Sequence, residues 1–515
     1  MKKILLFTLL PFFATAQGID KKIDQAFKPI SDFFSNVIFF TIYDIPFVLM
    51  LLVFSALFFT IYFAFPNIKY FRIAVNTVRG KYDDLEQKDK QSDDIKETIK
   101  YESKDGEVSH FQALATAVSG TVGNGNIAGV ALAIALGGPG ATFWMIICGL
   151  LGMSTKFVEC TLGVKYRDVD EDGTVYGGPM YYISKGLKER GFEFFGKIAA
   201  VLFAIFCIGG SFGGGNAAQS NQATIVLKDL MGLESAAAGA IIGIIIAVIV
   251  GVIIIGGIRR IANVTEKVVP FMALMYLIAC LYIILINFSL VDDAISLIIS
   301  EAFNPTAVGV GSVIGVLLVG FKRAAFSNEA GAGSASIAHS AVKTKYSASE
   351  GLVALLEPFI DTVVICTMTA LVIIIFNFGG FFEYGGDGGM VYIDGIGYEG
   401  AGITSKAFAK YIPFSNVFLT IAVVLFAVST MISWSYYGLQ SWKFIFGRGY
   451  YADLTYKILF LIFIVVGAAS SMSSIWAFSD AMIFAMIFPN MVGLFFLFPV
   501  VKRELAKYLD AIKNK

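Results

Sequence analysis

The sequence predicts an all-α protein that crosses a lipid bilayer eleven times, with ten of the crossings arranged as two inverted repeats of five. The first observation is composition, because 57% of the 515 residues are apolar and 15% are charged, against about 25% charged in soluble domains. The second is a series of eleven apolar segments long enough to span a bilayer. The third is that glycines interrupt the first segment of each repeat. We therefore expect discontinuous first and sixth core helices and one additional N-terminal helix.

The N-terminal part of the chain contains four predicted segments. Residues 1–16 have a basic start, a short apolar run and an Ala-Thr-Ala exit, which is typical of a secretory signal peptide. Residues 17–44 place apolar side chains at helical spacing among lysines and aspartates, which predicts an amphipathic segment on the outer membrane surface. The first full span is expected at 45–66. Residues 67–109 are polar and of mixed charge, which predicts a solvated cytoplasmic linker rather than a catalytic module.

Ten further apolar segments follow the linker, and each is long enough to cross the membrane. They lie at 110–136, 138–163, 196–227, 237–256, 264–289, 306–340, 351–378, 414–442, 453–472 and 476–500. The first five form a repeat over 110–289, and the last five form a repeat over 306–500. Residues 501–515 remain as a cytoplasmic tail.

The distribution of basic residues predicts the orientation of these spans. If the N-terminus lies outside, the predicted cytoplasmic stretches hold 27 Lys and Arg residues and the predicted outer stretches hold six. Cytoplasmic loops of membrane proteins carry such an excess of positive charge. One missed span would invert every later loop, so the bias supports the complete set. We expect a multi-pass protein of the inner (cytoplasmic) cell membrane, with the mature N-terminus outside and the C-terminus in the cytoplasm.

Histidine and cysteine usage gives no indication of a metal centre or a disulfide framework. The five cysteines are scattered through apolar segments without paired spacing, which is typical of small apolar side chains. Only His110 and His339 are present, too few for a histidine-based metal site. Lys156 and Glu159 lie near the predicted cytoplasmic end of their span, where we expect their charged ends to reach the membrane surface. We expect no nucleic-acid partner and a protein that functions as a monomer in the bilayer.

The stretch VSGTVGNGNIAGVALAIAL (118–136) contains four glycines within ten residues, inside an apolar segment. Glycine costs about 1 kcal/mol relative to alanine in a helix interior, and lipid cannot satisfy a freed backbone amide. One interpretation is close helix packing through small residues. The other is a discontinuous helix whose exposed amides and carbonyls bind a solute and an ion.

A second interruption supports the discontinuous-helix interpretation. It reads FSNEAGAGSA (326–335) and lies in the first segment of the second repeat. Each interruption contains a Gly-x-Gly at a similar distance into its segment. Because each repeat has five spans, the two repeats have opposite orientations in the membrane. Paired interruptions in inverted repeats indicate the binding site of a transporter.

Four motifs together resemble a known family. They are GTVGNGNIAGVALAIALGGPGATFWMIICGLLGMSTKFVE (120–159), GGPMYYISKGL (177–187), FKRAAFSNEAGAGSASIA (321–338) and WSYYG (434–438). They resemble the alanine/glycine:cation symporters, also called the sodium:alanine symporter family. The resemblance implies a ten-helix core of the amino-acid/sodium symporter type with one added helix. It also implies a transporter that imports alanine or glycine with sodium, less often with protons, and that needs no cofactor beyond the coupling ion.

The substrate site implied by these motifs uses backbone groups of both interruptions. We expect the substrate carboxylate at the amides of Asn124 and Gly125, with Gly123 allowing close approach. The family usually has Thr at position 124, so the preferred amino acid stays open. The substrate ammonium is expected at carbonyl groups around Phe326 and Ser327.

Two more side chains are candidates at family positions. Gln219 in GGGNAAQSNQA (213–223) either accepts a hydrogen bond from the ammonium or only links two helices. The indole of Trp434 either caps the small side chain of the substrate or is a packed aromatic ring.

Sodium requires oxygen ligands at close range. The exposed carbonyls of Ser119 and Val122 are candidates, and resemblance to the second sodium site of the wider fold adds Ala427, Ser429 and Thr430. The alternative is that these hydroxyl groups bond back to their own helix. The side chains considered for a second ion beside the carboxylate are Thr121 and Asn126.

Charged residues inside predicted spans are functional candidates by default. Glu329 and Arg323 flank the second interruption, where they either form a salt-bridged gate with the neighbouring Lys322 or polarise the site. Glu357 and Asp361 are four residues apart, which places them on one helix face. They either provide a carboxylate for a proton-coupled carrier or pair with basic residues.

Other classes of function are less consistent with the sequence. A passive channel does not need paired interruptions around an occluded site. An intramembrane hydrolase using Asp361 and Asp480 has no nucleophile–histidine pair. The chain has no Walker motif, so ATP-driven transport has no energy source. We expect a symporter of a small neutral amino acid that works by alternating access, with a proton-coupled carrier of the same fold as the alternative.

Overall fold

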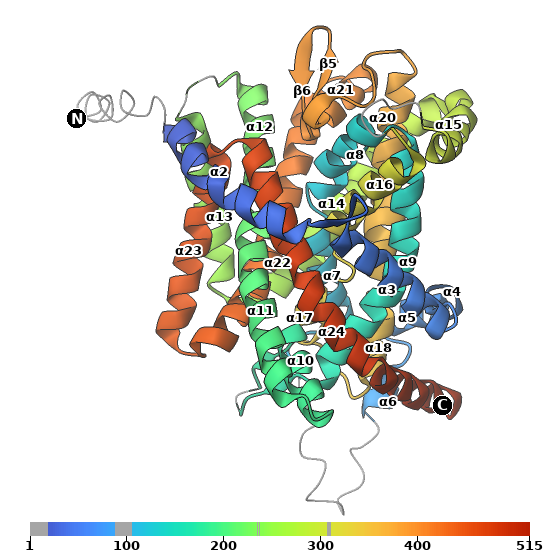
Figure 1. Ribbon diagram of the computed structural model, residues 1–515, viewed down its shortest axis with the longest axis vertical. Helices are drawn as coiled ribbons and strands as arrows, with labels where there is room; N and C mark the ends of the chain where they lie inside the picture. Colours follow the sequence, from blue (N-terminus) through green and yellow to red (C-terminus); the bar gives the residue numbers. More distant parts are fainter. Residues whose placement is uncertain (1–18, 88–105, 172, 234, 236, 306–310) are drawn as a thin grey trace, which may run out of the picture.

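The computed structural model describes residues 19–87, 106–171, 173–233, 235, 237–305 and 311–515, and they are almost entirely helical (Figure 1). The predicted signal peptide at 1–16 lies outside the described residues. So do residues 88–105 of the predicted linker and the first five residues of the segment predicted at 306–340.

The segments before the first predicted repeat contain an amphipathic helix, a shorter apolar helix and several short elements. In chain order they are α2 (Ile19–Ile38), β1 (Thr41–Ile42), β2 (Ile45–Pro46), α3 (Phe47–Tyr62), α4 (Pro66–Lys69), α5 (Phe71–Val78) and α6 (Asp83–Gln87).

The first predicted repeat contains two helices that include a π-helical turn. Its elements are α7 (His110–Thr121), η2 (Gly125–Gly129), α8 (Val130–Gly137), α9 (Gly140–Lys165), β3 (Asp168–Val169), β4 (Val175–Tyr176), α10 (Pro179–Glu189), α11 (Glu193–Phe212), η3 (Gly213–Ala217), α12 (Ala218–Met231), α13 (Ala238–Ile254) and α14 (Gly257–Ile286).

The second predicted repeat follows two short connecting helices, η4 (Phe288–Leu290) and α15 (Val291–Phe303). Its elements are α16 (Val313–Asn328), α17 (Ala335–His339), α18 (Ser347–Ala354), α19 (Leu356–Pro358), η5 (Phe359–Cys366), α20 (Thr367–Asn377), η6 (Asp387–Gly389), β5 (Val391–Ile393), β6 (Ile396–Tyr398), α21 (Ala401–Tyr411), α22 (Ser415–Phe446), α23 (Tyr450–Ala469) and α24 (Met472–Lys513). The strands pair as antiparallel hairpins, β1 with β2, β3 with β4 and β5 with β6.

All eleven predicted spans coincide with helical segments, but not all of these are long enough to cross a bilayer unaided. Among the described residues, seven helices have sufficient length and apolar character, and the bent pair of α7 with η2 and α8 makes eight. Helices α3 and α13 are apolar but have 16 and 17 residues. A helix of that length spans about 25 Å, somewhat short of a hydrocarbon core of about 30 Å. The second interruption separates α16 from α17.

Several of the predicted outer and cytoplasmic stretches lie at opposite ends of the molecule. Figure 1 shows α15, α21 and the β5–β6 hairpin at one end and α6 and α10 at the other. The first group belongs to stretches predicted outside, and the second to stretches predicted in the cytoplasm. The separation agrees with the predicted threading of the chain, and the charge bias remains the argument for which end faces the cytoplasm.

Residues outside the two repeats pack on the core. Helix α2 lies across α24 (Figure 1), with Ser31 Oγ donating to the carbonyl of Ser474 at 2.9 Å. Within the predicted linker, α5 packs against α18 rather than lying in solvent. Its apolar positions recur every three residues, so Ala74 is buried and the ring of Phe71 lies edge-on to Phe359 at 5.0 Å.

Both predicted interruptions are present. Helix α7 begins with a capping box, in which Ser109 and Gln112 bond each other's backbone amides, and it ends at Thr121. The chain then bends by 51° before the second half of the helix. Helix α16 ends at Asn328, and the following residue, Glu329, has a left-handed backbone with φ of 55°. The second interruption also uses positive φ at Gly331 and Gly333, which only glycine adopts at little cost.

Candidate functional site

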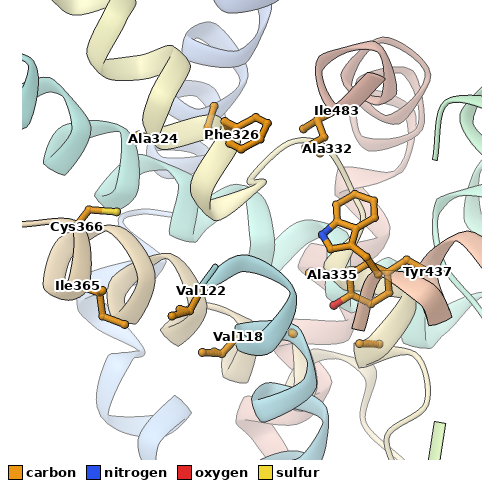
Figure 2. Packing of buried hydrophobic residues seen from close by; sticks show 14 of the residues in the cluster. Val118, Val122, Ala324, Phe326, Ala332, Ala335, Ile365, Cys366, Tyr437 and Ile483 are labelled. Atoms are coloured by element: carbon orange, nitrogen blue, oxygen red, sulfur yellow. The ribbon is translucent and has the colours of Figure 1, made fainter. Parts of the chain in front are cut away.

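The two interruptions face each other in the interior of the protein. Gly125 of the first and Phe326, Ser327 and Glu329 of the second line one buried cavity, together with Trp434 of α22. Figure 2 shows Val122 at the end of α7, Phe326 near the end of α16 and Ile483 of α24 in this region. The cavity offers about 10 Å³ to the centre of a water-sized sphere, which is room for about one water molecule. A larger solute requires these side chains to move apart.

Glycine permits the close approach of the neighbouring elements. A Cβ on Gly123 would lie 2.5 Å from Oγ1 of Thr430 and 3.0 Å from Oε1 of Gln219. A Cβ on Gly125 would lie 3.3 Å from Oγ and 3.4 Å from Cα of Ser327. Side chains at these positions would therefore push α22 and α16 away from the first interruption.

Gln219 occupies the amide that was predicted to receive the substrate carboxylate. Its Oε1 accepts a hydrogen bond from the backbone amide of Asn124 at 3.0 Å, and its Nε2 donates to the carbonyl of Gly214 at 3.0 Å. The Asn124 side chain also donates to the Gln219 carbonyl at 3.3 Å. Gln219 thus links α12 to the first interruption. Its amide oxygen lies where a carboxylate oxygen would meet the Asn124 amide.

The predicted sodium ligands on α7 and α22 are in contact. Oγ1 of Thr430 donates to the carbonyl of Ser119 at 3.0 Å, and Oγ of Ser119 donates to the carbonyl of Ser429 at 2.8 Å. The Ser429 hydroxyl bonds back to its own helix, at the Phe426 carbonyl. Val122 and Ala427 are buried on the same two segments, and neither takes part in these hydrogen bonds. The oxygens of Ser119, Ser429 and Thr430 therefore gather at one point between the helices.

Asp361 connects the two interruptions. Its Oδ1 accepts hydrogen bonds from Nδ2 of Asn126 at 2.6 Å and from Oγ of Ser327 at 3.1 Å. Its Oδ2 accepts from Oγ1 of Thr362 at 2.6 Å. Asp361, Asn126 and Thr362 have no solvent exposure, and Ser327 has 2%. Thr121, which was paired with Asn126 in the sequence prediction, instead directs its hydroxyl back to α7.

Glu357 and Asp361 do not share a partner, although their spacing predicts one helix face. Glu357 Oε1 is 3.0 Å from Nζ of Lys156, and its Oε2 is 3.7 Å from Nε2 of His339. The π-helix η5 begins between the two carboxylates at Phe359. Because a π-turn changes the residue period, spacing in an ideal α-helix does not hold across it.

The prediction that Lys156 and Glu159 extend to the membrane surface is wrong. Both side chains are fully buried. Helices α17, α18 and α19 cover α9 at this level, so Lys156 reaches Glu357 rather than water. Glu159 accepts a hydrogen bond from Nδ2 of Asn490 at 2.7 Å.

Trp434 is held at the cavity by Glu329. Its indole Nε1 donates to Oε1 of Glu329 at 2.9 Å, and the Ser334 hydroxyl donates to the other carboxylate oxygen. The ring lies directly on the backbone of Gly215, where any Cβ would overlap it. Trp434 is therefore both a packed residue and part of the cavity wall.

Arg323 and Lys322 pair with Asp480 of α24. Arg323 Nη2 contacts Asp480 Oδ2, and Lys322 Nζ lies 3.0 Å from the same oxygen. The Arg323 guanidinium also lies 5.6 Å from the ring centroids of Phe326 and Trp476. These two rings stack with centroids 5.0 Å apart. Phe326 also lines the cavity, so the cluster adjoins it.

The sequence does not predict the pairing of Asp480 or the contribution of Ile483 and Thr362. Asp480 is a carboxylate inside a predicted span, a feature that indicates function by default. From the sequence, its only suggested role is in a hydrolase dyad. Ile483 is one of many apolar residues in α24, so no signal in the sequence distinguished it.

The sequence profile described as the sodium:alanine symporter family matches residues 29–515. The chain is 37% identical over 472 residues to the sodium/alanine symporter AgcS of Methanococcus maripaludis, covering 91% of this chain and 96% of the relative. It is 31% identical over 409 residues to the amino-acid carrier protein AlsT of Bacillus subtilis, covering 79% of this chain and 82% of the relative.

The fold also resembles that of a solved transporter. The crystal structure of MhsT in complex with L-phenylalanine superimposes with a TM-score of 0.52, covering 78% of this chain and 99% of that one, at 12% identity. At this identity the similarity establishes the fold alone. The predicted all-α fold with interrupted helices is confirmed.

Proposed function

We propose, from the premise that this chain belongs to the sodium:alanine symporter family, that it imports alanine or glycine together with sodium. The chain is a multi-pass membrane transporter and not an enzyme. The transported amino acid, the coupling ion and the orientation of the chain in the membrane belong to our proposal.

One observation carries the proposal, the meeting of the two interruptions at a buried cavity lined by backbone and polar groups. Interrupted helices offer partial positive charge at one half-helix end and partial negative charge at the other. A zwitterionic amino acid has the complementary charges. The cavity has room for about one water molecule, so Phe326, Trp434 and Ile483 must move apart to admit a substrate. The smallest amino acids require the least movement, which favours glycine and alanine.

We assign the substrate carboxylate to the amides of Asn124 and Gly125, beside Gly123. In this step the carboxylate displaces Oε1 of Gln219 from the Asn124 amide, and the freed glutamine remains next to the substrate. The ammonium group bonds carbonyl oxygens near Phe326 and Ser327. The exchange keeps the buried amide paired whether or not substrate is bound, which avoids the cost of an unsatisfied donor.

We assign one sodium ion to the oxygens between α7 and α22, from Ser119, Val122, Ala427, Ser429 and Thr430. Sodium takes over the Ser119 carbonyl that Thr430 now bonds, and the Thr430 hydroxyl becomes a second ligand. Such an ion binds only when the two helices are close together, so its binding favours the closed arrangement.

We assign a second cation to Asp361, with the Ser327 hydroxyl as a neighbouring oxygen ligand. Asn126 directs its Nδ2 to Asp361, and its Oδ1 accepts a hydrogen bond from the Gly123 amide. The Asn126 oxygen therefore becomes a ligand only after its side-chain amide turns over. A carboxylate, an amide oxygen and a hydroxyl are the groups that a hard cation prefers. Because the three residues lie on η5, η2 and α16, an ion there joins both interruptions. A proton on Asp361 would have a similar effect, which is the basis of the proton-coupled alternative.

We propose that Arg323 with Asp480 forms the outer gate and that the protein works by alternating access as a monomer. The charge bias of the loops puts the N-terminus outside and the C-terminus in the cytoplasm of the inner membrane. In that orientation the Arg323 cluster separates the cavity from the outside.

The test is uptake into proteoliposomes with the amino acid, the sodium gradient and the proton gradient varied independently. We expect alanine or glycine to accumulate against its gradient only when sodium enters downhill. Accumulation driven by a proton gradient in sodium-free buffer would replace sodium with the proton. Equilibration without accumulation would indicate a channel and reject the proposal.

A further inference from the structure

A second cavity lies at the end of the molecule that carries most of the positive charge. It measures about 460 Å³ and is formed by the end of α9, the start of the β3–β4 hairpin, the linker between α17 and α18, and the last turns of α24. It is separate from the site described above and shares no residue with it.

Basic side chains dominate the lining of this cavity. Four lining residues are basic and two are acidic: Lys165, Arg167, Lys345, Lys507, Asp168 and Glu504. Glu504 is close to two of the lysines, at 3.3 Å from Lys165 and 2.9 Å from Lys507. Asp168 also pairs with Lys185 and Arg448, two cations outside the lining. The lining therefore contains more basic than acidic side chains.

The cavity lies at the depth of a lipid headgroup. The spans predicted at 138–163 and 476–500 end just before Lys165 and one turn before Glu504. A residue immediately beyond the end of a span lies in the polar region of the bilayer. Basic pockets between helices at this level bind the headgroups of anionic lipids.

The linker that forms one wall is joined to the first interrupted helix. Arg167 Nη1 donates to the linker carbonyls of Ser340 at 2.8 Å and Val342 at 2.5 Å. The Lys343 amide of the same linker donates to the carbonyl of Val108 at 2.8 Å. Val108 lies two residues before the start of α7. A ligand in the cavity therefore contacts the α17–α18 linker. The same linker is hydrogen-bonded to the residues just before α7, the first half of the first interrupted helix.

We propose that this cavity binds the phosphate headgroup of an anionic phospholipid of the surrounding leaflet and so holds the α17–α18 linker in place. The phosphate ester meets Lys345 and Lys507 at the mouth, and the acyl chains extend along α9 and α24 into the bilayer.

The test measures thermal unfolding of the full chain in detergent while phosphatidylglycerol is titrated against phosphatidylcholine as the uncharged reference. Wild type should gain a rise in Tm that saturates with phosphatidylglycerol. The double variant K345Q/K507Q should need about 30-fold more of this lipid for half of the rise, since each lysine near a membrane surface contributes about a fivefold change in affinity. The K345R/K507R variant should retain the wild-type response.

The matched control is K188Q/K197Q, which removes the same charge from exposed side chains of α10 and α11. It should respond to phosphatidylglycerol as wild type does. An equal loss in the control, or an unchanged titration in K345Q/K507Q, would reject the site. An equal rise in Tm with inorganic phosphate would show a soluble anion rather than a lipid and would also overturn the proposal. Because unfolding is measured without substrate, the result is independent of the transport function proposed above.

Discussion

Replacing Asp361 with Asn tests the ion site that joins the two interruptions. The substitution keeps the size of the side chain and the acceptor for Asn126 and Ser327, which donate at 2.6 and 3.1 Å. It removes the negative charge and converts one oxygen into a donor that faces the hydroxyl of Thr362. Thr362 can accept this bond after its hydroxyl turns, so we expect the protein to fold.

The expected loss of cation affinity in D361N follows from the loss of one charged ligand. A hydrogen bond or ion contact to a charged group contributes about 2 kcal/mol net, which corresponds to about a 30-fold weaker affinity for the cation. The half-maximal sodium concentration for alanine uptake by D361N proteoliposomes should therefore rise about 30-fold. If this site holds one of two sodium ions, the sodium dependence should also become less steep.

Glu159→Gln is the control for this experiment. Glu159 is also a fully buried carboxylate that accepts a bond from an asparagine side chain, but it lines no part of the cavity. E159Q should keep the wild-type sodium dependence. A D361N protein with unchanged half-maximal sodium and unchanged steepness would remove Asp361 from the ion path. A loss of proton-driven uptake alone would assign Asp361 to a proton.

Three further substitutions test other parts of the site. Gly125→Leu should abolish alanine binding, measured by calorimetry, because even a Cβ there lies 3.3 Å from Ser327; normal binding would place the substrate elsewhere. Thr430→Ala removes one hydroxyl ligand of about 1 kcal/mol and should raise half-maximal sodium about fivefold, while an unaltered sodium titration would exclude this ligand. Arg323→Gln leaves Asp480 with its other partner only and should lower Tm, since breaking a buried ion pair costs about 3–5 kcal/mol. The double variant R323Q/D480N should recover much of that Tm, and no recovery would mean that the two residues are not coupled.

The backbone of the site could be predicted from sequence because local composition favours it. Four glycines near Asn124 weaken a continuous helix in lipid. Glycines alone do not decide this, because the three glycines at 213–215 lie within one continuous helical span. In the second interruption, Gly331 and Gly333 adopt positive φ. The pairing of the two patterns in opposite repeats therefore locates both interruptions and predicts that they meet.

The side-chain pairings could not be predicted, because they depend on packing between distant segments. Lys156 illustrates this limit. Its position near the end of a span predicts contact with water, whereas α17 to α19 cover it and supply Glu357 as its partner. Similarly, nothing near Gln219 in the sequence indicates that its side chain bonds the Asn124 amide across 95 residues.

The position of Asp361 shows how a local irregularity can serve coupling. In an uninterrupted α-helix, Asp361 would share a face with Glu357 and with the buried Lys156, where a paired carboxylate has little reason to bind an ion. The π-turn η5 separates the two carboxylates. Glu357 neutralises Lys156, and Asp361 is left with neutral donors from both interruptions. A buried carboxylate surrounded by neutral groups gains much from a cation. Since that cation contacts both repeats, its binding energy depends on their relative position, and this dependence is what links ion entry to alternating access.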